Sequence, residues 1–126
     1  MKRVLSLLIL MSFLFLQVAP AYVFAASPSA SAKYIKNKNV VRASFGNLKG
    51  VKNVSYTLYY QGNGIGQGVE GSFKPGKKKI SWSKDLFLGT CSGKVCIRHR
   101  NIKNIKLEVI SKLTNGKSVK KLIKVK

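Results

Sequence analysis

Few side chains in this sequence could perform chemistry, and the two cysteines are the clearest. Cys91 and Cys96 enclose the segment Ser-Gly-Lys-Val, and the chain has no other cysteine. An isolated pair in an exported protein is normally a disulfide, and Ser-Gly-Lys permits the tight turn that closure needs. The spacing is wrong for a redox Cys-x-x-Cys motif, and a metal site would have His99 as its third ligand and no fourth. We therefore predict a Cys91–Cys96 disulfide and no metal site.

The sequence has few residues that could perform acid–base catalysis. His99 is the only histidine, and the only acids are Glu70, Asp85 and Glu108. General acid–base catalysis needs two titrating groups within reach of one substrate, which these four residues could supply only through a fortunate fold. Gly66–Gly71 formally matches the dinucleotide-binding pattern Gly-x-Gly-x-x-Gly, but the helix that must follow is replaced by Ser-Phe-Lys-Pro-Gly. We predict no enzymatic activity and no cofactor.

Lysine is by far the most abundant charged residue in the sequence. The chain has 24 Lys and Arg residues against 3 Asp and Glu, which gives a formal net charge of +21. Such a charge repels itself and attracts any polyanion. Because most of these residues are lysine, they favour loose point-charge contacts over bidentate recognition. The expected partner is an anionic polymer, namely a wall polymer, lipopolysaccharide or nucleic acid, and the sequence predicts no particular protein partner.

The N-terminal segment predicts export. Lys2 and Arg3 precede an apolar run from Val4 to Ala19, and Val23 and Ala25 occupy the −3 and −1 positions of a peptidase site. We predict a signal-peptide helix over residues 1–25 and no stable membrane span after cleavage. The alternative is an uncleaved anchor, because the apolar run is long enough to cross a bilayer. Both place the following domain outside the cytoplasm, as a secreted or cell-envelope protein.

The rest of the chain predicts one all-β domain. Residues 26–39 begin with small polar residues and are expected to form a flexible tail, and residues 40–126 a β-sandwich. Short runs rich in Val, Ile, Tyr, Phe and Thr alternate with Gly, Asn, Pro and Lys. About seven strands in this length are typical of an antiparallel immunoglobulin-like or fibronectin-like sandwich, with a small barrel as the alternative. The predicted strands are Val40–Phe45, Val54–Gln61, Gly68–Phe73, Lys79–Leu88, Val95–Arg100, Ile105–Leu113 and Val119–Val125. Five glycines between Gly62 and Gly71 predict a wide loop between the second and third of these strands.

The last two strands permit a prediction of register. A three-residue loop with Gly116 in the left-handed region places Leu107 opposite Ile123, which makes one face coherently apolar. The other face then carries four lysines, and the first directly opposes the last: Lys106, Lys112, Lys120 and Lys124. Facing lysines cost stability, so these four residues are the predicted polyanion-binding site. The alternative is a solvated face that protects an edge strand.

Three motifs carry a resemblance to a known group of proteins. Gly64–Phe73, Leu88–Cys96 and Lys112–Lys117, in this order behind a signal peptide, resemble small exported proteins of uncultured, ultra-small bacteria. The resemblance covers about Val40 to Lys126. It implies an envelope or secreted location and an immunoglobulin-like fold, and it carries over no activity or site residue.

The sequence thus predicts an exported cationic binding module that contacts anionic surface polymers or nucleic acid. The alternative function is a structural or adhesive envelope domain whose charge is incidental.

Overall fold

The structure is a computed structural model that describes residues 27–126, and the predicted signal peptide over residues 1–25 lies outside the described residues. The described chain is all-β, and its nine strands pair antiparallel in three sheets. The strands are β1 (Ser29–Ile35), β2 (Val40–Gly46), β3 (Val51–Gly62), β4 (Ile65–Phe73), β5 (Trp82–Phe87), β6 (Gly89–Ser92), β7 (Val95–Arg98), β8 (Lys103–Leu113) and β9 (Ser118–Lys124).

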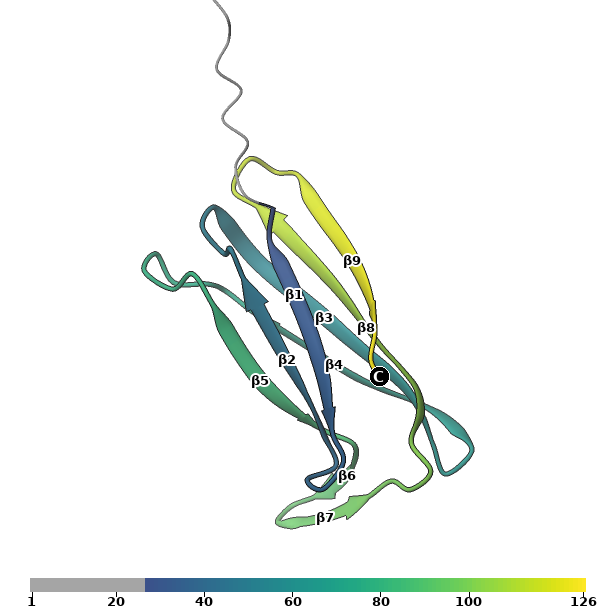
Figure 1. Cartoon of the computed structure of the whole chain (residues 1–126). Helices are drawn as coiled ribbons and strands as arrows, with labels where there is room; N and C mark the ends of the chain where they lie inside the picture. The colour runs from purple at the N-terminus through teal and green to yellow at the C-terminus, as the bar shows by residue number, and fades with distance from the viewer. Residues whose placement is uncertain (1–26) are drawn as a thin grey trace, which may run out of the picture.

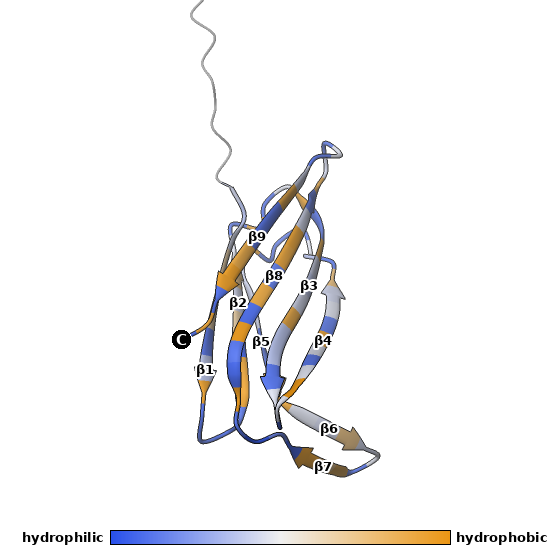
Figure 2. Cartoon of the chain, turned by 90° about the vertical axis from the view of Figure 1, so that its right-hand side faces the viewer, coloured by the Kyte–Doolittle hydropathy of each residue, from blue (hydrophilic) through white to orange (hydrophobic). Residues whose placement is uncertain are grey.

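Two larger sheets form the body of the protein, consistent with a β-sandwich. One has the strand order β1-β2-β5 and the other β4-β3-β8-β9 (Figure 1). In Figure 2 the four-stranded sheet faces the viewer and the three-stranded sheet lies behind it. Strands β6 and β7 form a separate two-stranded sheet at one end, which we call the disulfide hairpin.

Alternating side chains from the two facing sheets build the core. Along β3 the residues Val54 and Leu58 are fully buried, whereas Ser55 and Thr57 between them point to the other face. Buried residues of β2, β5 and β8 complete the same cluster. Trp82 stacks on Phe73 with ring centroids 4.0 Å apart at the edge of that cluster.

The expectation of a flexible tail over residues 26–39 was wrong. Ser29–Ile35 is strand β1, and it pairs along its whole length with β2. The inward and outward positions of β1 alternate between small side chains. Ala30 and Ala32 pack against the core, and Ser29 and Ser31 are exposed. Because alanine and serine differ little in hydrophobicity and are weak strand formers, the period of two is hard to see in the sequence.

The prediction for Val95–Arg100 was also wrong in part. We expected one strand of the sandwich, but Val95–Arg98 pairs only with Gly89–Ser92, and Cys91 lies opposite Cys96. The predicted Lys79–Leu88 strand is shorter, because β5 begins at Trp82. The seven strands of the two larger sheets therefore include β1 in place of Val95–Arg98.

The β3–β4 connection is tighter than expected. The two strands run from Val51 to Gly62 and from Ile65 to Phe73, so only Asn63 and Gly64 remain for the turn. Both have positive φ, at 56° and 75°, as a type I′ hairpin turn requires. The glycines of Gly66–Gly71 thus belong to a strand and not to a wide loop.

The last hairpin has the predicted register. Leu107 lies opposite Ile123 and Lys106 opposite Lys124. Gly116 has a φ of 85°, and the Leu113 amide bonds to the Lys117 carbonyl at 2.8 Å across the three-residue loop. The left-handed glycine closes the bulged form of the turn, which keeps the apolar side of β9 on the core.

Candidate anion-binding face

The four predicted lysines lie on the outer face of the four-stranded sheet, and all four are exposed. Lys106 and Lys112 belong to β8, and Lys120 and Lys124 to β9. Their common side follows from the period of two, because Leu107 and Val109, which alternate with them on β8, are buried in the core. The sequence therefore located the face correctly, whereas anion binding by it remains a prediction.

The four residues do not form one uniform row. Lys106 and Lys124 oppose each other directly, whereas Lys112 lies opposite Ser118 and Lys120 opposite Ile110. The lysines thus gather in two pairs, one toward each end of the hairpin. We call Lys106 and Lys124 the facing pair, and Lys112 and Lys120 the distal pair.

Acidic residues separate the two pairs. Glu108 lies on β8 between them and forms an ion pair with Lys120, with 3.4 Å between Oε2 and Nζ. Thr57 separates Glu108 from Glu70, so two of the chain's three acids lie in one row across the sheet. Neither lysine of the facing pair has an ion-pair partner among residues 27–126. The facing pair is therefore positive charge without an acidic partner in this part of the chain, as is Lys112 toward the other end of the hairpin.

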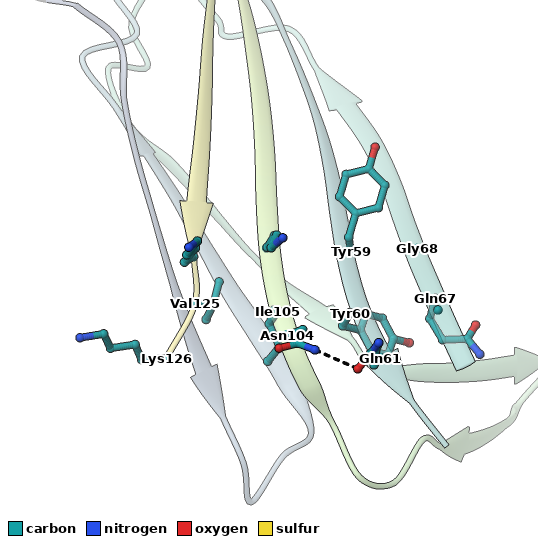
Figure 3. A pocket seen from close by; sticks show the side chains of 12 residues that line it. Tyr59, Tyr60, Gln61, Gln67, Gly68, Asn104, Ile105, Val125 and Lys126 are labelled. Atoms are coloured by element: carbon teal, nitrogen blue, oxygen red, sulfur yellow. Dashed lines mark hydrogen bonds between the residues drawn. The ribbon is translucent and has the colours of Figure 1, made fainter. Parts of the chain in front are cut away.

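A shallow groove adjoins the facing pair. It has a volume of about 1050 Å³, and its lining combines the two lysines with an aromatic ring, glycines and amides. The Tyr59 side chain is 46% exposed, because its partner across β4 is Gly68, which has no side chain to cover the ring. Figure 3 shows Tyr59, Gln67 and Gln61 on neighbouring strands, with the Asn104 amide donating to Gln61 Oε1 at 2.9 Å.

These groove residues were not predicted from the sequence. Nothing in the sequence alone sets a glycine opposite Tyr59. That neighbour follows from the two-residue turn at Asn63-Gly64, which fixes the register of β4 on β3. A reading of this Asn-Gly pair as a hairpin turn would have found the uncovered ring.

The predicted disulfide between Cys91 and Cys96 is present. The single histidine lies nearby, and both of its ring nitrogens have hydrogen-bonding partners. His99 Nδ1 is 2.9 Å from Tyr60 Oη, and Nε2 is 3.1 Å from Thr90 Oγ1. Among residues 27–126, no three histidine, cysteine or acidic side chains are grouped as a metal site requires.

The groups with shifted pKa values lie away from the facing pair or beneath it. A bidentate hydrogen bond from Arg42 lowers the pKa of Asp85 on the other sheet, and the same pair raises the pKa of Arg42. Burial raises the pKa of Tyr60, whose side chain points into the core under the groove.

Comparison of the sequence with profiles of known protein families gave no match, and comparison with curated proteins gave no significant match. Residues 27–126 contain no apolar helix of membrane-spanning length. The intramolecular disulfide is typical of proteins outside the cytoplasm.

Proposed function

We propose that the protein is an exported, cationic binding module that holds an anionic polymer on the outer face of its four-stranded sheet. The single observation behind this proposal is the facing pair. Lys106 and Lys124 oppose each other without an acidic partner in the described chain. Like charges directly across a sheet are destabilising, and a phosphate or carboxylate held between them would relieve the repulsion.

The strand order supports the finer fold assignment. A three-stranded sheet β1-β2-β5 facing a four-stranded sheet β4-β3-β8-β9 is the arrangement expected of an immunoglobulin-like sandwich of fibronectin type. Sandwiches of this kind serve as extracellular modules, and an exported location would also account for the disulfide. The predicted signal peptide supplies the route.

The charge of the whole chain would assist the encounter. With a formal net charge of +21 and only three acids, the protein attracts polyanions from a distance, and the facing pair then provides a local contact. Lysine makes compact point contacts without fixed geometry, which suits a flexible polymer. Beside the pair, the uncovered Tyr59 ring offers a stacking surface and the amide of Gln61 offers hydrogen bonds.

The test is binding of the purified protein, from Ala26 to Lys126, to a fluorescent acidic glycan and to fluorescent DNA at several salt concentrations. Neutral glycan serves as the ligand control. One variant changes the four face lysines to Gln: Lys106, Lys112, Lys120 and Lys124. A charge-matched control changes four lysines of the β4–β5 connection to Gln: Lys74, Lys77, Lys78 and Lys79.

The proposal predicts tight binding that falls steeply with salt, is lost in the face variant and persists in the control variant. Preference between glycan and DNA then identifies the class of polymer. Equal binding by both variants would show that the face is only solvated. Absence of binding near physiological salt would favour the structural or adhesive alternative, for which the exposed Ile110 and Leu122 on the same face offer apolar contacts.

A further inference from the structure

The disulfide hairpin has a surface that the core does not explain. Seven of its eight strand residues are exposed, and only Gly89 is partly covered. Val95 and Ile97 are each 66% exposed, and they share one side of β7 because they are two residues apart. Figure 2 shows the hairpin projecting past the ends of the two larger sheets, with apolar residues along β7.

The fold nevertheless holds this hairpin in place. An isolated two-stranded hairpin is marginal in water, and here the disulfide clamps the two strands together. At its base, the Asn39 amide donates to the carbonyls of Leu88 and His99, at 2.6 and 3.2 Å, on either side of the hairpin. The Thr90 hydroxyl also forms a hydrogen bond with His99 Nε2. A covalent bond and a buried amide thus hold in place a hairpin that exposes two aliphatic side chains to solvent.

The surroundings of the two aliphatic side chains are cationic. Lys94 lies in the turn of the hairpin, Arg98 on β7 and Arg100 just after it, and the sequence has no acid between Leu86 and Leu107. The Arg98 guanidinium also donates to the Asn37 carbonyl at 3.5 Å, which brings the β1–β2 turn alongside. That turn adds the lysines at positions 36 and 38.

We propose that the disulfide hairpin is a membrane contact, in which Val95 and Ile97 enter the interface of an anionic lipid bilayer. Aliphatic side chains on a projecting hairpin lose water on entering the headgroup boundary. The surrounding lysines and arginines meet the negative surface potential, and two weak signals of this kind together hold a peripheral protein. This site is separate from the facing pair and does not rest on polymer binding there.

The experiment is sedimentation of the Ala26–Lys126 protein with vesicles of phosphatidylglycerol and phosphatidylcholine, compared with phosphatidylcholine alone. All nine strands and the buried core cluster lie within residues 27–126, so this part carries its own fold. The test variant combines Val95→Ser with Ile97→Ser. The control variant is Ile80→Ser, because Ile80 is also 66% exposed but lies in the β4–β5 connection at the other end of the sandwich.

We expect binding to anionic vesicles and not to phosphatidylcholine, with about tenfold weaker partitioning of the double variant since two aliphatic side chains no longer leave water. Ile80→Ser should bind as the parent does. A Val95→Trp protein should show blue-shifted emission on vesicle binding, whereas Ile80→Trp should not. Equal partitioning of the double variant, the control and the parent would overturn the proposal, as would unshifted emission from Val95→Trp.

Discussion

Asn39 should contribute more to stability than any other polar residue of the β1–β2 turn. Its replacement provides the sharpest test of the fold. Its side chain is almost fully buried, and the residue has a φ of 54° in the left-handed region. The amide donates to Leu88 and His99 carbonyls, and its oxygen accepts from the Tyr34 hydroxyl at 3.0 Å. Three parts of the chain therefore meet at one side chain.

The magnitude follows from these bonds. Each hydrogen bond contributes about 1 kcal/mol net, and a buried partner left unsatisfied costs about 1–3 kcal/mol. The Leu88 carbonyl keeps the His99 amide as a donor, so the loss concentrates on the His99 carbonyl and the Tyr34 hydroxyl. Asn39→Gly should therefore lower the free energy of unfolding by about 3 kcal/mol. Asn39→Ala should cost about 1 kcal/mol more, because alanine is strained at positive φ.

Urea unfolding followed by Trp82 fluorescence measures both losses. Asn47 is the matched control, because it also has positive φ, at 51°, but is exposed and makes only a long 3.4 Å contact to the Ser27 carbonyl. Asn47→Gly should be nearly neutral, and Asn47→Ala should show the backbone strain alone. A loss below about 1 kcal/mol for Asn39→Gly would refute the claim that the buried amide holds the base of the hairpin, since three bonds should be worth more.

Three further predictions concern the disulfide, the packing of β4 and the behaviour in alkali. Changing Cys91 and Cys96 to Ser should lower the free energy of unfolding by about 2 kcal/mol, from the entropy of the short closed loop, and leave polymer affinity nearly unchanged. Gly71→Ala should cost about 1–3 kcal/mol, because a Cβ there would overlap the Tyr56 hydroxyl in the packed core. Burial raises the pKa of Tyr60 above its ordinary value of 10.0, so its contribution to stability is present below pH 10 and falls as the pH rises through the shifted pKa.

Each of these has its own control. Lost polymer affinity with an unchanged melting temperature would contradict a structural role for the disulfide. Gly66→Ala, on the same strand but with open space around the added Cβ, should be within about 0.5 kcal/mol of the parent in chemical unfolding. Tyr60→Phe removes the titration, so melting temperatures between pH 9 and 11 should fall more steeply for the parent than for this variant. Parallel curves would contradict the assignment to Tyr60.

Much of the fold could be predicted from the sequence where apolar and polar residues contrast strongly. The alternation along Val54–Tyr60 and along Ile105–Val109 identified two central strands, and the requirement for one apolar face fixed the register of the last hairpin. The disulfide followed from the count and spacing of cysteines. In each case one physical requirement, burial or covalent closure, dominated the others.

The missed features depend on weak local signals or on distant partners. Strand β1 alternates serine with alanine, so burial against β2 decides its structure and its own sequence does not. The groove around Tyr59 depends on which residue of β4 lies opposite, and the ion pair of Glu108 with Lys120 depends on side-chain placement across two strands. The four predicted lysines share a face, yet their division into two pairs became evident only with these neighbours in place.

The division of the lysines leads to the most direct test of anion binding. Two double variants remove the same charge from the same hairpin: one combines Lys106→Gln and Lys124→Gln, and the other combines Lys112→Gln and Lys120→Gln. For each variant we measure the slope of log affinity for the preferred polyanion against log salt concentration. The facing pair should lower the slope by about two, since each lost lysine contact accounts for about one. The distal pair should lower it by about one at most, because Glu108 already compensates Lys120 and, of these two lysines, only Lys112 is without an ion-pair partner in the described chain. Equal slopes for the two variants, or a larger change for the distal pair, would contradict the claim that the facing pair holds the anion.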